Sequence, residues 1–155
     1  MSLQRCDVLI IGGAVVGSAV AHFLVERGGL DVLLVERDPS YRDCATTRSL
    51  ASLRHQFSTA LNVQMSMFGT QFVREAASLL AVDGEAPALG WHEGGYLFLA
   101  GEAGAPVLRS NHALQQRCGA DIAWLEPAAL AARFPWLAVD DLKAGTLGLT
   151  GEGWL

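Results

Sequence analysis

Residues 7–25 read DVLIIGGAVVGSAVAHFLV, with eighteen uncharged residues after the aspartate. The length of this uncharged stretch is compatible with a membrane span or a signal peptide. The internal order indicates something else, because Val8 to Ile11 is an aliphatic run typical of a buried parallel strand, Gly12-Gly13 breaks it, and apolar residues then recur at helical spacing. The helix continues through Glu26 and Arg27 with no small-residue cleavage site. We therefore predict a strand, a tight turn and a helix, with neither secretion nor a membrane span.

The turn follows the dinucleotide fingerprint G-x-G-x-x-G, with Gly12, Ala14 and Gly17 at its three glycine positions. In that pattern the first glycine turns the chain sharply, the second lets the backbone approach a pyrophosphate, and the third lets the helix pack closely. Ala14 departs from the pattern, and a positive φ there would cost about 1 kcal/mol. The stretch predicts a phosphate-binding turn formed by Gly12, Gly13, Ala14, Val15, Val16 and Gly17.

A second aliphatic run, Val32 to Val35, ends in Glu36 about 20 residues after Gly17. A carboxylate at the tip of the second strand can accept hydrogen bonds from the ribose hydroxyls of an adenosine. Gly28-Gly29 is expected to end the intervening helix, which closes a strand–helix–strand unit. The alternative is a unit that serves packing alone, with Glu36 merely solvated. The combined features favour adenine dinucleotide binding.

Composition excludes several classes of function. The chain has 155 residues, which suffice for one domain or one and a half. Its net charge of −5, without a basic cluster, argues against nucleic-acid binding. Charged residues are 17% and apolar residues 51%, so further protein is expected to cover part of the surface. Neither cysteines nor histidines show metal-ligand spacing or a disulfide framework, so we expect no metal and a cytoplasmic protein with reduced thiols.

Downstream, an apolar stripe predicts a core-packed helix of about 20 residues, capped by Ser58 or Thr59 and followed by Asp83-Gly84. The stripe consists of Leu61, Met65, Phe68, Phe72, Ala76 and Leu79. Residues 89–92 and 96–100 are expected to form a hairpin. A helix ending at Gly119, a short helix starting at Pro127 and a strand over residues 142–149 complete the prediction.

Six segments in this order resemble the FAD-dependent amine oxidoreductases related to D-amino-acid oxidase, glycine oxidase, sarcosine oxidase and dimethylglycine dehydrogenase. They are DVLIIGGAVVGSAVAHFL, VLLVERD, ATTRSLASLRHQFS, GYLFLA, LEPAALAARFPWL and GTLGLTGEGW. The resemblance spans essentially the whole chain, and the third segment and residues 125–154 are its most specific parts. It implies an α/β fold, with a Rossmann-like FAD-binding βαβ unit followed by the start of an antiparallel substrate domain. The expected boundaries are residues 1–85 and 86–155.

The resemblance also implies the site. Arg37 and the segment Thr46, Thr47, Arg48 and Ser49 would contact the flavin cofactor, while Arg54 and His55 would lie near its ring and the substrate. Small hydroxyls and backbone N–H groups suit a phosphate, and an arginine adds a fixed cation for a pyrophosphate or a carboxylate. Arg48, Arg54 and His55 are therefore the catalytic candidates. The alternative is a polar loop with solvated arginines.

The implied activity is oxidation of the C–N bond of an amino acid or N-methylated amine by hydride transfer to FAD. We expect a small-molecule amine or amino acid as the substrate. The chain is expected to be an N-terminal portion of a longer protein, inactive alone and prone to self-association. The rival function is a non-catalytic dinucleotide-binding subunit that works only with a partner chain. An NAD-dependent dehydrogenase would share the glycine turn but not the segment TTRSLASLRHQF.

Overall fold

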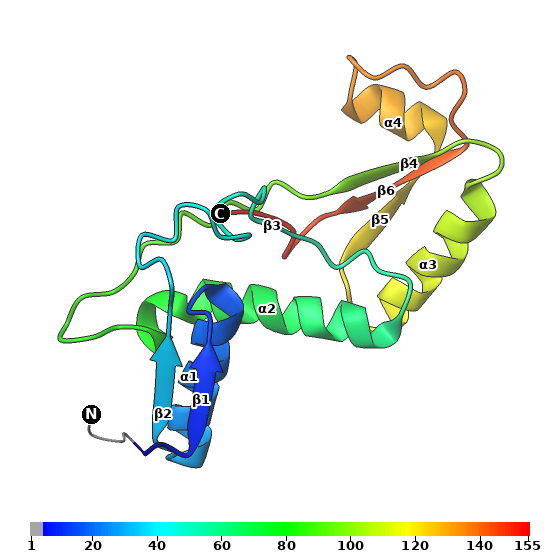
Figure 1. The fold of residues 1–155 in the computed structure, drawn as a ribbon. Helices are drawn as coiled ribbons and strands as arrows, with labels where there is room; N and C mark the ends of the chain where they lie inside the picture. Colours follow the sequence, from blue (N-terminus) through cyan, green and yellow to red (C-terminus); the bar gives the residue numbers. More distant parts are fainter. Residues whose placement is uncertain (1–4) are drawn as a thin grey trace. The chain divides into compact units, whose positions relative to one another are not determined.

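The computed structural model describes residues 5–155, and the chain divides after Ala51 into two compact units (Figure 1). We call them the N-terminal unit and the C-terminal unit. The boundary predicted after residue 85 lies inside the C-terminal unit, beyond the long helix α2, Ala60–Leu79. By its contacts, this helix belongs with the antiparallel strands that follow it. The class of fold is mixed α/β, as predicted.

The N-terminal unit is a strand–helix–strand unit. It consists of β1 (Val8–Ile11), α1 (Val15–Gly28) and β2 (Val32–Val35), and the two strands pair in parallel from their first residues to their last. Gly29 follows the helix with a φ of 58° and donates its N–H to the carbonyl of Val25. The predicted strand, turn, helix and glycine cap are therefore confirmed. The parallel pairing brings the carboxyl ends of both strands to the same edge.

The C-terminal unit contains a three-stranded antiparallel sheet in the order β4-β6-β5 (Figure 1). A short antiparallel pair, β3-β7, lies in the same unit. Its strands are β3 (Ser52–Leu53), β4 (Leu97–Ala100), β5 (Ile122–Leu125), β6 (Ala144–Gly148) and β7 (Gly153–Trp154); besides α2, its helices are α3 (Ala105–Arg117) and α4 (Pro127–Arg133). The predicted helices after residue 100 and the last long strand are confirmed. The strand β5 was not predicted.

Close approach of α4 to the central strand depends on Gly145. A Cβ at this position would lie 2.9 Å from a side-chain carbon of Leu130, which is fully buried. The contact joins α4 to β6, in which Ala144 and Leu147 are also buried. This packing forms one part of the core of the unit, and Val63, Ala120 and Ile122 form another.

The predicted hairpin over residues 89–100 is wrong. β4 pairs with β6, and His92 instead makes an isolated bridge to Trp154. Gly95 has a φ of 78°, and a Cβ there would lie 2.5 Å from the carbonyl oxygen of Gly148. Of the two glycines that suggested a hairpin turn, Gly95 therefore lets the chain pass close to the end of β6, and Gly94 makes room for the ring of Trp154.

The boundaries predicted for α2 are nearly correct, but its predicted core face is not. Thr59 caps the helix by accepting a hydrogen bond from the Asn62 N–H. The side that packs inside the unit carries Val63, Thr70 and Ala76, whereas four residues of the predicted stripe are 42 to 65% exposed. These four are Leu61, Met65, Phe68 and Leu79. The sequence periodicity therefore identified an apolar face but not what it packs against.

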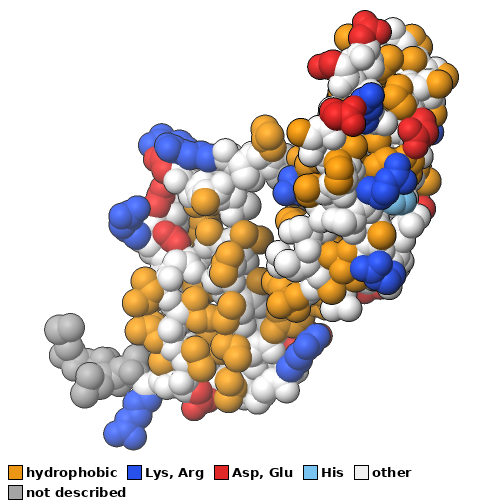
Figure 2. All heavy atoms as spheres, turned by 90° about the vertical axis from the view of Figure 1, so that its right-hand side faces the viewer, with side chains coloured by type: hydrophobic (Ala, Val, Ile, Leu, Met, Phe, Trp, Pro, Cys, Tyr) orange, Lys and Arg blue, Asp and Glu red, His pale blue; other side chains and the backbone are white. Residues whose placement is uncertain are grey.

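Exposed hydrophobic side chains are numerous, and the view in Figure 2 shows many hydrophobic side chains at the surface among scattered charged residues. In the N-terminal unit Ile11 is 82% exposed and Leu50 is 86% exposed. Across residues 5–155, no helix combines the length and the apolar character that crossing a bilayer requires.

Candidate functional site

The turn between β1 and α1 explains the first and third glycines of the fingerprint. Gly12 has a φ of 100°, which side-chain-bearing residues rarely adopt, and a Cβ at Gly17 would lie 1.8 Å from the carbonyl oxygen of Gly12. Ala14 has a φ of −66° in an extended conformation. The alanine at the second glycine position therefore causes no backbone strain, because the strain expected there required a positive φ.

The start of α1 offers backbone N–H groups that have no acceptor within the helix. The N–H groups of Gly12 and Gly13 are already used, the first by the carbonyl of Val35 at 2.8 Å and the second by Glu36 Oε2 at 2.7 Å. The first four N–H groups of a helix lack acceptors within it, and here these belong to residues 14–17. A phosphate at this helix end would satisfy them and interact favourably with the helix dipole.

Glu36 lies at the carboxyl end of β2, beside the turn. Its two carboxylate oxygens accept the N–H groups of Asp38, at 2.8 Å, and Gly13. These backbone donors, Asp38 first, lower the pKa of Glu36 below its ordinary value, so the side chain is charged at neutral pH. Each oxygen still has a lone pair for a hydroxyl donor. The carboxylate lines an open cavity of about 510 Å³ with Ile11, Gly12, Val35 and Arg37.

Gly13 is required for a reason that the fingerprint does not contain. A Cβ there would lie 2.7 Å from the Tyr41 hydroxyl and 2.8 Å from a methyl carbon of Leu34. Tyr41 itself adopts a φ of 54°. The tyrosine thus packs over the turn and fills the space that the missing side chain leaves. A tyrosine in a polar loop gave no sequence signal for this contact.

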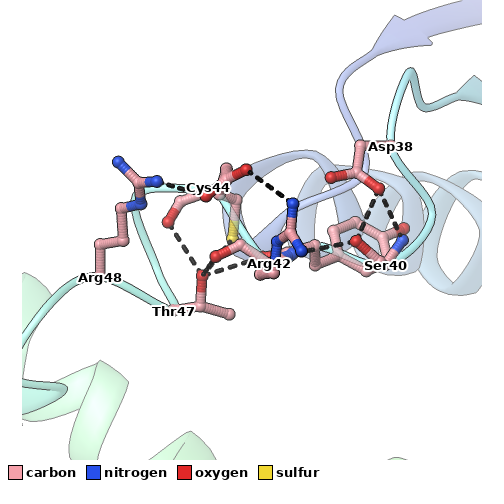
Figure 3. A network of polar contacts seen from close by, with 8 residues as sticks. Asp38, Ser40, Arg42, Cys44, Thr47 and Arg48 are labelled. Atoms are coloured by element: carbon pink, nitrogen blue, oxygen red, sulfur yellow. Dashed lines mark hydrogen bonds and ion pairs between the residues drawn. The ribbon is translucent and has the colours of Figure 1, made fainter.

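The segment from Thr46 to Ser49 belongs to a network of polar contacts within the N-terminal unit (Figure 3). The Thr47 hydroxyl lies within hydrogen-bonding distance of the carbonyls of Tyr41, Arg42 and Cys44, and the Ser49 hydroxyl donates to Thr46. Arg48 pairs with Asp43 and its side chain is 67% exposed. These side chains fold the loop, and their roles toward flavin stay a prediction.

Arg54 lies in the C-terminal unit against a cluster of aromatic rings. Its guanidinium carbon is 4.9 Å from the ring centroid of Phe57, 5.3 Å from that of Phe98 and 5.9 Å from that of Tyr96. Cation–π attraction stabilises such an arrangement, and the rings restrict the side chain. Among the described residues, no group accepts a hydrogen bond from its buried Nε. The structure therefore holds a fixed cation with spare donor capacity.

His55 is buried, and its ring is engaged inside the C-terminal unit. Its Nε2 lies 2.9 Å from the Thr70 hydroxyl, which donates to the carbonyl of Gly151. A Cβ at Gly151 would lie 2.4 Å from the imidazole ring. Burial is the main cause that lowers the pKa of His55, which favours the neutral imidazole. The ring thus helps to join α2 to the turn before β7.

A buried carboxylate, Glu152, connects distant segments and was missed by the sequence analysis. Its Oε1 accepts the backbone N–H of His55 at 2.6 Å, and its Oε2 accepts Gln56 Nε2 at 2.9 Å. The same amide nitrogen of Gln56 donates to the carbonyl of Tyr96, and its amide oxygen accepts the Thr146 hydroxyl at 2.6 Å. Burial raises the pKa of Glu152, while the donors oppose that shift.

A second carboxylate, Glu93, fastens the loop before β4. It accepts the Gly151 N–H at 2.9 Å and the indole N–H of Trp91 at 3.1 Å, and it forms a two-pronged ion pair with Arg74 of α2. These contacts, the Gly151 N–H first, lower the pKa of Glu93 to about 2. Through Glu93, the Glu-Gly-Gly segment therefore joins α2 to the turn before β7.

The glycine turn, the acid after β2 and the antiparallel sheet all lie within the residues that match one known family. Residues 7–155 match the family described as DAO, FAD dependent oxidoreductase. The chain belongs to this family. FAD is accordingly its cofactor, and the expectations of an oxidoreductase and of a Rossmann-like nucleotide-binding unit are confirmed.

Individual relatives agree. The chain is 39% identical over 156 residues to the FAD-dependent oxidoreductase domain-containing protein 1 of Xenopus laevis, covering 97% of this chain and 31% of that protein. Its fold is similar to that of L-proline dehydrogenase from P. horikoshii, with a TM-score of 0.81 at 21% identity, covering 99% and 38% of the two chains. It is also similar to glycine oxidase from Bacillus cereus, with a TM-score of 0.68 at 27% identity, covering 97% and 40%. The chain thus spans about a third of the length of its curated relatives.

Proposed function

We propose that the protein containing this chain oxidises the C–N bond of an amino acid or N-methylated amine by hydride transfer to FAD. The observation that carries the carboxylate part of this proposal is the fixed Arg54 cation with an unpaired Nε. Similarity to a glycine oxidase and an L-proline dehydrogenase supports the same substrate class. Both names denote amino-acid substrates, which carry a carboxylate.

The residues of the N-terminal unit fit the adenosine and pyrophosphate of FAD. The absence of a side chain at Gly17 lets the helix start directly at the turn, and residues 14–17 offer free N–H groups to a pyrophosphate. Glu36 is charged and has lone pairs for ribose hydroxyls. We therefore assign the pyrophosphate to the start of α1 and the adenosine ribose to Glu36.

FAD, when bound, supplies the acceptor for a hydride from the carbon next to the amine nitrogen, which leaves an imine for water to hydrolyse. The contribution of this chain to that reaction is binding and orientation. Arg54 would pair with the substrate carboxylate, because a guanidinium offers two parallel donors in the geometry that a carboxylate accepts. Its three aromatic neighbours exclude water from one side of that pair and strengthen it.

The test is anaerobic reduction of the bound flavin in the longest polypeptide that contains these residues. Glycine, sarcosine and L-proline are compared with glycolate, which replaces the amino group of glycine by a hydroxyl and keeps the carboxylate. We expect the flavin absorbance to bleach with at least one amine and not with glycolate. Bleaching by glycolate alone would refute the amine class, and a protein that never retains flavin would support the rival function of a non-catalytic subunit.

A further inference from the structure

The segment that carries Arg54 is held by a carboxylate almost one hundred residues further along the chain. Glu152 is fully buried and receives the N–H of His55 and the side-chain amide of Gln56. A fully buried carboxylate is costly unless it is paired or hydrogen-bonded. A hydrophobic residue could fill the same space, so packing alone does not explain why this position is an acid.

The surrounding backbone leaves room for this carboxylate. A Cβ at Gly148 would lie 1.9 Å from Glu152 Oε2, so the last residue of β6 has to lack a side chain for the acid to occupy its place. A Cβ at Gly153 would similarly lie 1.9 Å from the carbonyl oxygen of His92. Gly148 therefore provides the space that the carboxylate occupies, and Gly153 lets the residue after the acid pass close to the backbone of His92.

Glu152 is linked to Arg54 in two ways, through the backbone and through the aromatic ring of Tyr96. The first link is through the backbone, because Glu152 Oε1 accepts the N–H of His55, the residue that follows Arg54. The second is through the aromatic ring, because Gln56, held by Oε2, donates to the carbonyl of Tyr96, and the ring of Tyr96 lies beside the guanidinium. The negative charge of Glu152 also attracts the guanidinium itself.

We propose that Glu152 is a positioning residue: its buried carboxylate, with Gln56, holds the backbone of residues 54–56 and the Tyr96 segment so that Arg54 faces a carboxylate ligand. The inference rests on the proposed function, since it takes Arg54 to bind the substrate carboxylate. Glu152 acts through Arg54 and does not touch the ligand.

The test uses the flavin-loaded protein, in the longest polypeptide that contains these residues, and acetate as the carboxylate probe. Acetate binding is followed by the change in the flavin absorption spectrum. The variants are Arg54→Leu, Glu152→Gln and the control Glu102→Gln, whose side chain is 85% exposed and pairs with Lys143 at the surface. FAD dissociation and melting temperature are measured for each, because a purely structural role would change stability without a selective change in acetate binding.

We expect Arg54→Leu and Glu152→Gln each to weaken acetate binding by about tenfold, with the FAD dissociation constant and the control unchanged. Unchanged acetate binding in Glu152→Gln beside a weakened Arg54→Leu would overturn the inference and leave the proposed function intact. Unchanged binding in Arg54→Leu would instead contradict the role of Arg54, on which both depend.

If Glu152→Gln does not retain flavin, a less disruptive substitution tests the inference instead. Thr146→Val keeps the carboxylate and its two donors but removes the hydroxyl that holds the amide oxygen of Gln56. Loosening Gln56 should weaken acetate binding by about threefold, since one neutral hydrogen bond is lost. Acetate binding equal to that of the unaltered protein would overturn the inference.

Discussion

At the scale of single residues, acids with several donors organise both units, and each acid holds backbone at a bend. Glu36 accepts two backbone N–H groups at the dinucleotide turn. Glu93 accepts the backbone N–H of Gly151 before β7, and Glu152 accepts that of His55. The sequence analysis found Glu36, because its distance from the glycines is part of a known pattern. It did not find Glu152, because nothing local marks an acid whose partners lie 96 and 97 residues away.

The lowered pKa of Glu93 predicts how the melting temperature depends on pH. Its pKa falls from 4.5 to about 2 in the folded protein, so its contribution to the free energy of unfolding is complete above about pH 4.5 and is lost as the pH falls toward 2. In Glu93→Gln this contribution is absent at every pH. We therefore expect the unaltered protein to lose more melting temperature than the variant between these pH values, as measured by differential scanning fluorimetry. Parallel curves would show that the contacts of Glu93 do not persist in solution.

At the scale of elements, local signals predicted the helices better than the strands. Thr59 and Pro127 mark helix starts chemically, and both helices begin where these residues predict. The short strand β5 carries no such mark, and β4 finds its partner 44 or more residues away, so a hairpin was the natural but wrong expectation. Pairing of short strands is decided by tertiary packing, which a local pattern does not contain.

The turn into α1 gives a prediction at this scale. In Gly17→Ala the new methyl would clash with the carbonyl of Gly12, so the helix has to move away from the turn and the anion site is distorted. We expect FAD binding to be lost or weakened by at least about tenfold, as measured by fluorescence of the bound flavin. The matched control is Gly69→Ala in α2, where a Cβ meets nothing within 4 Å and helix propensity favours alanine by about 1 kcal/mol. Equal FAD affinity in both variants would argue against the assigned anion site.

At the scale of the whole molecule, the two units carry different parts of the proposed function. The N-terminal unit contains the glycine turn and Glu36, and the C-terminal unit contains Arg54 and the network that holds it. Family membership and the FAD cofactor were predictable because the diagnostic segments are short and contiguous. The packing of the α2 stripe was not predictable, because periodicity shows that a face is apolar and not which surface it meets.

The central claim is that the turn and Glu36 hold the adenosine half of FAD, and titration of the flavin-free protein with FAD in a calorimeter tests it most directly. Removing a charged acceptor of ribose hydroxyls should weaken FAD binding by about tenfold or more in Glu36→Ala. Glu26→Ala, which removes an exposed acid from α1, serves as the control and should bind FAD normally. Equal dissociation constants for the unaltered protein, Glu36→Ala and Glu26→Ala would contradict the account.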